Sequence, residues 1–334
     1  MANTHAQLTA PEISQLWSDC LSDTLILCQL RYFEQHVEDQ EIAQIIQTRI
    51  EKTREHYGFI VDLFNAIGYP IPVGFNENED VDINSDRLFT DHYMLEFLRQ
   101  LSQISMNAYG TAAAFSTRPD IRQFYADRLQ DSQQLNEEAT SLGIDKGYVI
   151  IAPSLPIPSK PDFVKKKSFL TGWFGERRPV TGSEITFLFA NIQRNAIGAA
   201  TMMGFAQTTA SKTLQRYFQR GKDIANKHIE IFSSILREND VPVPMTWDTE
   251  VTDQTSFVFS DKLMLYQTLA LNSLGLGFYG LSMSNSPRHD LGVHYTRLMA
   301  EIAQFTEDGT ELMIDHGWLE QPPQAANRRQ LMNE

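Results

Sequence analysis

Acidic and imidazole side chains in the first half of the chain are the residues best suited to carry chemistry. A carboxylate-bridged iron or manganese centre in a helical bundle takes one Glu from each of two helices and a Glu-x-x-His pair from each of the other two. The first half offers side chains of these types on two expected helices: Glu51, Glu55, His56, Glu137 and Glu138. They are the candidate ligands for a metal-binding or oxidoreductase function.

The first helix expected in the second half lacks the acid that this chemistry needs. No acid occurs between Ile185 and Lys212, and no Glu-x-x-His motif occurs anywhere in the 334 residues. His56 has a counterpart, His228, in this half without the ligand set, which favours a packing role for both histidines. We therefore expect neither a cofactor nor a catalytic residue.

A second set of polar residues occurs twice, at equal spacing. In each half an Arg-x-Asp pair is followed five residues later by a tyrosine: Arg118, Asp120 and Tyr125, then Arg288, Asp290 and Tyr295. As a binding site, the arginine would hold an anionic ligand beside the tyrosine hydroxyl. As structural residues, the Arg–Asp pair would clamp a turn, and the tyrosine would form a hydrogen bond across a bundle. Duplication preserves fold-forming residues more readily than a site, which favours the structural interpretation.

These candidates belong to a chain that is duplicated almost from end to end. Residues 9–153 recur as residues 181–323, and from Tyr109 onward 13 of 39 aligned residues are identical without a gap. A repeat of about 145 residues has the size of an ordinary domain. The sequence therefore predicts four parts: a domain at 9–148, a linker at 149–180, a second domain at 181–323 and a tail at 324–334.

Each repeat has the pattern of four helices. Thr9 with Glu12, and Thr181 with Glu184, form capping boxes at the start of the first helix, and apolar residues then follow at spacings of three and four. The fourth helix is expected to start at Pro119 and at Pro287. About 20 residues rich in Pro, Gly, Asn and Asp separate the second helix from the third. Such a crossover makes these two helices parallel, so the predicted fold class is all-α, with two tandem ferritin-like four-helix bundles of up-down-down-up topology.

The third helix of the second repeat carries no charge from Leu263 to Ser284. That length could span a bilayer. Its serines, amides and three glycines instead favour a helix that is buried on nearly every side. We expect it, together with the first helix of the same repeat, to form an interdomain or oligomer contact rather than a membrane span.

Composition narrows the class of partner and the compartment. The net charge of −14 argues against nucleic acid as a partner. Prolines exclude a long helix from the linker, where Lys165–Lys167 lie close to Phe169, Trp173 and Phe174. A basic, aromatic segment suits an anionic membrane surface, but we favour a connector whose aromatics pack on the two acidic bundles.

Cys20 and Cys28 are too far apart on one helix for a disulfide, and the N-terminus has no signal peptide, so a cytoplasmic protein is expected.

Several motifs of the second repeat resemble a known family. They are Phe205-Ala-Gln207, Tyr217-Phe-x-Arg220, Phe259-Ser-Asp-Lys-Leu-Met264, Ser286-x-Arg288-x-Asp290 and Gly317-Trp-Leu-Glu-Gln-Pro-Pro323. The resemblance is to a tandem family of unknown function from Bacillus-type bacteria (DUF3231), whose members are often labelled spore coat proteins. It covers nearly the whole chain. It implies a ferritin-like fold and no particular reaction.

Together these observations predict a non-catalytic structural or interaction protein, in the cytoplasm or the spore coat. It would act through protein partners or by self-association, for example as a homodimer. Two alternatives stay open. One is the metal-binding or oxidoreductase function with iron or manganese in the first bundle. The other is a small apolar ligand in a bundle core, because an apolar pocket leaves no sequence motif.

Overall fold

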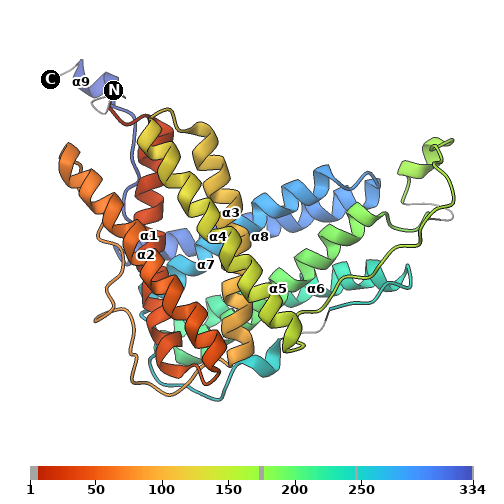
Figure 1. The fold of residues 1–334 in the computed structure, drawn as a ribbon, viewed down its shortest axis with the longest axis horizontal. Helices are drawn as coiled ribbons and strands as arrows, with labels where there is room; N and C mark the ends of the chain where they lie inside the picture. The colour runs from red at the N-terminus through yellow and green to blue at the C-terminus, as the bar shows by residue number, and fades with distance from the viewer. Residues whose placement is uncertain (1–6, 173–176, 245–246, 333–334) are drawn as a thin grey trace. The chain divides into compact units, whose positions relative to one another are not determined.

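The computed structural model describes residues 7–172, 177–244 and 247–332, which form helices joined by extended segments (Figure 1). The first repeat contains α1 (Ala10–His36), α2 (Gln40–Ile67), α3 (Asp91–Phe115) and α4 (Pro119–Asp145). The second contains α5 (Gly182–Thr208), α6 (Lys212–Arg237), α7 (Asp261–Ser284) and α8 (His289–Asp315). The short elements are η1 (Lys167–Leu170), η2 (Asp248–Glu250) and α9 (Arg328–Leu331). The all-α fold class and the two tandem repeats are confirmed.

The helix starts follow from local side-chain chemistry. Both predicted capping boxes are present, with Thr9 and Glu12 opening α1 and with Thr181 and Glu184 opening α5. The prediction that the last helix begins at Pro287 is wrong, because α8 begins at His289. Pro287 aligns with Thr117 rather than with Pro119, so it precedes the helix instead of occupying its first turn.

Contacts at the ends of the helices show which helices of each repeat run parallel and which run antiparallel. At the start of α1, Glu12 Oε1 accepts hydrogen bonds from the amides of Thr117 and Arg118, both at 2.8 Å, in the turn between α3 and α4. At the other end of the second repeat, Thr209 after α5 donates to Asp261 at the start of α7 (2.6 Å). The third helix of each repeat therefore runs antiparallel to the first and parallel to the second. The up-down-down-up topology is confirmed.

The chain divides into two compact units that differ from the two repeats. One unit comprises Met1–Val81, Leu98–Ala139 and Leu319–Glu334, and the other comprises Asp82–Phe97 and Thr140–Trp318. The end of the first crossover and the start of α3 thus belong to a unit made mostly of the second repeat. In return, the residues after Trp318 belong to the unit made of the first repeat.

Helix α7 is less buried than the sequence predicts. Leu263, Met264, Leu265 and Tyr279 are buried, but Leu271 and Leu274 are half-buried, and Leu281 is 47% exposed. The expectation that this helix is buried on nearly every side is wrong for its second half. The absence of charged residues means that burial of this segment would cost little. It does not mean that other helices cover it. None of the helices in the described ranges combines the length and hydropathy needed to cross a membrane.

In the described parts of the linker, 149–172 and 177–180, there is little regular structure besides η1, and Lys165–Lys167 are exposed. Phe169 is half-buried beneath the guanidinium of Arg178, at 4.1 Å from the ring centroid. Trp173 and Phe174 lie outside the described residues. On α1, the thiols of Cys20 and Cys28 are buried and do not form a disulfide, and burial raises the pKa of Cys20 to about 12.

Candidate functional site

The densest group of buried charges lies in the first bundle, around Arg128 of α4. Its side chain is fully buried and donates to both carboxylate oxygens of Asp23 on α1, at 2.9 and 2.6 Å. The same guanidinium donates to the hydroxyl of Tyr109 on α3. One turn along α1, Asp19 accepts a hydrogen bond from Tyr125 of α4 (2.9 Å) and lies 4.0 Å from Arg128. The cluster therefore joins three helices through side chains that bond to one another.

The electrostatics of this cluster follow from its burial. Desolvation raises the pKa of Asp19 to about 6; Arg128 opposes the rise, and the neighbouring charge of Asp23 adds to it. Burial also raises the pKa of Tyr109. Each side chain in the cluster has a bonded partner on another helix, so the arrangement can hold these polar groups within the core.

The second repeat carries uncharged residues at the same positions. Asn191 and Asn195 align with the two aspartates, and Leu298 aligns with Arg128. Asn191 donates to Ser282 (2.8 Å), and Asn195 donates to the hydroxyl of Tyr279 (2.7 Å), so the amides also bond across the bundle. The two acids and the cation have changed together.

The two histidines occupy equivalent places between the second and fourth helices. His56 lies 3.0 Å from Asp131, and His228 lies 3.1 Å from Glu301, in both cases through Nε2. Burial lowers the pKa of His56 to about 3, and the cations Arg128, Arg49 and Lys52 lower it further. The neutral imidazole is the stable form, and it joins two helices in each bundle.

The carboxylates named as metal candidates point elsewhere. Glu51, Glu55 and Glu137 are exposed, and Glu138 is half-buried and accepts from Gln134 at 2.8 Å. Of these candidates only His56 is buried, and its near neighbour is Asp131 instead. Within the described ranges, no three His, Cys, Asp or Glu side chains are grouped so that they could hold a metal ion.

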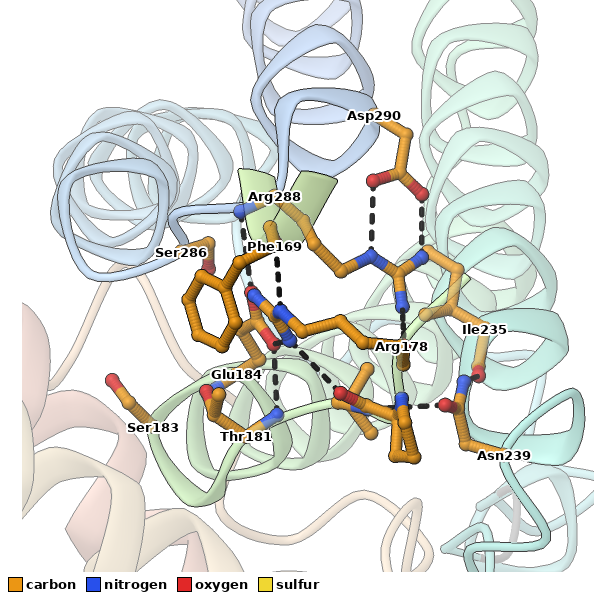
Figure 2. A network of polar contacts seen from close by, with 12 residues as sticks. Phe169, Arg178, Thr181, Ser183, Glu184, Ile235, Asn239, Ser286, Arg288 and Asp290 are labelled. Carbon is orange, nitrogen blue, oxygen red and sulfur yellow. Dashed lines mark hydrogen bonds and ion pairs between the residues drawn. The ribbon is translucent and has the colours of Figure 1, made fainter. Parts of the chain in front are cut away.

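The repeated Arg-x-Asp motif lies at the turn between the third and fourth helices. Arg288 donates to both oxygens of Asp290, at 3.0 and 2.5 Å, and only 1% of the arginine is exposed. Figure 2 shows Arg178, from the linker, placed between this pair and the start of α5, where it donates to both oxygens of Glu184 at 2.7 and 2.8 Å. The amide of Arg288 also donates to Glu184 (3.3 Å). The linker is thereby fastened to one end of the second bundle.

The first repeat has the same motif without the linker arginine. Arg118 donates to Asp120 at 3.1 and 2.6 Å, and Glu12 takes the place of Glu184. Burial raises the pKa of Glu12, but the amides of Arg118 and Thr9 outweigh it and lower the value to about 2. In each repeat the Arg–Asp pair lies at the turn, and the amide of its arginine donates to the glutamate that opens the first helix. A role in ligand binding stays a prediction.

The two tyrosines of the repeated motif differ in their partners. Tyr125 donates to Asp19, as described above. The hydroxyl of Tyr295 is buried beside Asn191, Ser282 and Ser286, without a hydrogen bond of ordinary geometry to the described residues. Sequence reasoning named both tyrosines but missed Arg128. The signal that could have found it was the joint change of Asp19, Asp23 and Arg128 to uncharged residues in the aligned repeat.

Three comparisons relate the chain to known proteins. A family model described as "Protein of unknown function (DUF3231)" matches residues 1–160 and again residues 168–331. A crystal structure of a "putative spore coat protein" from Bacillus halodurans C-125 is similar to 46% of this chain and 98% of its own, with 15% identity and a TM-score of 0.41. No curated protein matches.

Proposed function

The chain belongs to the DUF3231 family of proteins of unknown function, and we propose that it is a non-catalytic structural protein that acts through protein–protein contacts. The observation that carries this proposal is that the acidic side chains in and around the first core are each bonded to a side chain of another helix. Asp23 is paired with Arg128, Asp19 with Tyr125 and Asp131 with His56. Side chains that use their hydrogen bonds on one another hold helices together. A catalytic group must instead keep a donor or acceptor that a substrate can reach.

Comparison of the two repeats supports the same proposal. The second bundle keeps its topology with two amides and a leucine where the first has two acids and an arginine. A catalytic group cannot be exchanged in this way without loss of its chemistry. A core group can, provided that the buried charges disappear together.

The surface for such contacts is the second half of α7. Leu271, Leu274, Phe278 and Leu281 follow one another at spacings of three and four, and all are half-buried or exposed. Ser273 and Gly277 beside them are small and exposed, which permits close approach of another helix. Apolar surface of this kind on a helix suits a second apolar helix. We therefore assign this stripe to self-association with a second copy of the chain.

Native mass spectrometry of the freshly purified full chain tests the proposal. We expect a mass without bound transition metal and a dimer population that increases with concentration. A stoichiometric excess of iron or manganese would contradict the non-catalytic role, and a monomer at every concentration would contradict self-association.

Two variants locate the contact. Leu281→Glu should abolish the dimer, because it places a charge in the stripe. Thr111→Glu is the matched control, since Thr111 is the aligned and exposed residue of α3. Equal loss in both variants would place the contact elsewhere.

A role in the spore coat, which the resemblance implies, stays a prediction. A fluorescent fusion of the full chain, followed through sporulation of its host, would test it. Fluorescence that collects on the forespore surface is the expected result, and uniform cytoplasmic fluorescence would contradict it.

A further inference from the structure

The two crossovers of the chain pair with each other in an antiparallel way. The amide of Asp82 donates to the carbonyl oxygen of Val258 (2.9 Å), and the amide of Thr252 donates to that of Leu88 (2.9 Å). Next to the second bond, Phe89 and Val251 form an antiparallel bridge, and the amide of Thr90 donates to the carbonyl oxygen of Glu250 (3.1 Å). All of these residues lie within one compact unit.

The pairing is self-complementary in sequence. Asp82 aligns with Thr252, and Leu88 aligns with Val258, both at the repeat offset of 170. If each residue is replaced by its aligned counterpart in the other repeat, the bond from Asp82 to Val258 becomes the bond from Thr252 to Leu88, and the reverse also holds. A local two-fold relation between equivalent residues is the property of an interface between two copies of one subunit.

Buried side chains extend this contact onto α5. Leu88 is fully buried, Phe89 and Tyr93 are each 1% exposed, and the two rings stack at 3.9 Å. The hydroxyl of Tyr93 shares a buried hydrogen bond with Thr201 of α5 (2.7 Å). Phe89 packs so closely on Gly204 of α5 that a Cβ there would lie 2.9 Å from the ring. The first repeat thus supplies core residues to the unit that contains the second.

The second repeat also supplies residues to the unit made mostly of the first. In the other unit, the carboxylate of Glu320 accepts from the amides of Val73 and Gly74, at 2.9 and 2.8 Å. Glu320 follows the second repeat's last helix, whereas Val73 and Gly74 lie in the first crossover. Each compact unit therefore contains chain from both repeats.

We propose that the two repeats associate as the two subunits of a dimer do, through this self-complementary crossover surface, and that segment 154–160 of the linker is a tether that raises their local concentration. The partner of the first repeat is the second repeat of the same chain. The linker itself supports this assignment, because its segment 154–160 is exposed and Ile157 is 95% exposed. A tether of that kind adds effective concentration without adding contact.

Cleavage of the linker in the otherwise intact protein tests the proposal. A protease site is inserted between Ile157 and Pro158, the folded protein is cut, and the product is examined by size-exclusion chromatography and native mass spectrometry. We expect both fragments in one species with the mass of the whole chain, separating only in denaturant. Two separate species after cleavage would overturn the proposal.

A pair of glycine variants of the cut protein identifies the surface. Gly204→Val drives a side chain into Phe89, so the fragments should bind about tenfold or more weakly, as expected for overpacking of one buried contact. Gly198→Val is the matched control on the same helix, because a Cβ at Gly198 meets no atom within 4 Å. Undiminished binding in Gly204→Val would show that the fragments associate elsewhere and would overturn the assignment.

A milder variant keeps the test decisive if Gly204→Val fails to fold. Tyr93→Phe removes the hydroxyl that bonds to Thr201 and leaves both rings in place. The cut variant should dissociate at a measurably higher concentration than the cut wild type. Equal dissociation constants would count against the crossover surface.

Discussion

Replacement of Arg128 by leucine copies into the first repeat the residue that the second repeat carries as Leu298. It removes a fully buried guanidinium that donates to both oxygens of Asp23. Asp19 and Asp23, which are 5% and 3% exposed, are left without a cation. Loss of one partner of a buried ion pair costs about 3–5 kcal/mol. We expect a decrease of that size in the free energy of unfolding at pH 7.

Removal of the two acids as well should restore stability. With Asp19→Asn and Asp23→Asn added to Arg128→Leu, the first core acquires the polar pattern of the second. Replacement of a whole buried ion pair by uncharged residues is neutral or stabilising by about 1–4 kcal/mol. The triple variant should therefore be at least as stable as the wild type, although it carries three core substitutions.

The dependence on pH gives an independent check. Burial raises the pKa of Asp19 from 3.8 to about 6 in the folded protein. A raised folded pKa gives a stability contribution that is fully present below pH 3.8 and is lost as the pH rises through about 6. Without Arg128, whose charge opposes this rise, the carboxyl of Asp19 is held still more strongly in the protonated form. The Arg128→Leu variant should therefore be more destabilised at pH 7 than at pH 5.

Urea unfolding followed by circular dichroism measures all three effects. The wild type, the single variant and the triple variant are compared at pH 5 and pH 7, and similar slopes are required so that midpoints report stability. A loss below about 1 kcal/mol in Arg128→Leu, which is the range of a solvent-exposed pair, would refute the reasoning. So would a triple variant as unstable as the single one.

Three further predictions follow from the site. Glu12→Gln should lower the free energy of unfolding by about 1–2 kcal/mol, because it removes a helix cap. The wild type should also lose stability as the pH falls from 4.5 to about 2, and the variant should lose less over this range in urea unfolding. An equal loss in both proteins would contradict this role. The imidazole of His56 should stay neutral down to about pH 3, so its stabilisation is lost only as the pH falls from 6.5 towards that value; a midpoint near 6.5 in the NMR titration would disprove it. Arg178→Ala should speed chymotrypsin cleavage at Phe169, while Arg177→Ala, which removes an exposed ion pair, should not; equal rates would show that Arg178 does not fasten the linker.

The parts of the fold that sequence predicts are those specified by local chemistry. A hydroxyl and a carboxylate three residues apart, as in Thr9 and Glu12, satisfy free amides wherever they occur before an apolar helix. The crossover between α2 and α3 was visible because prolines and glycines interrupt the helical pattern. The start of α8 was misplaced by two residues, because proline is acceptable both before a helix and in its first turn.

The parts that sequence did not predict depend on contacts between distant residues. Arg128 looks like a surface residue in isolation, and only its bonds to Asp23 and Tyr109 explain its burial. The pairing of Asp82 with Val258 joins two irregular segments that carry no periodicity. The exposure of α7 could not be predicted, because hydropathy shows only that burial of these side chains would be favourable. Whether another segment covers them depends on tertiary contacts.

The difference between the two cores has a consequence for assembly of a duplicated chain. Two identical repeats could exchange their equivalent helices during folding, because each helix would fit either bundle. Placement of α8 in the first bundle would set Leu298 against Asp23 and leave the acid unpaired. Placement of α4 in the second bundle would bury Arg128 among the amides of Asn191 and Asn195. Each error costs several kcal/mol, the penalty of a buried charge without a partner. The charged core of one repeat and the uncharged core of the other therefore favour the placement of the first and fourth helices in their own bundles.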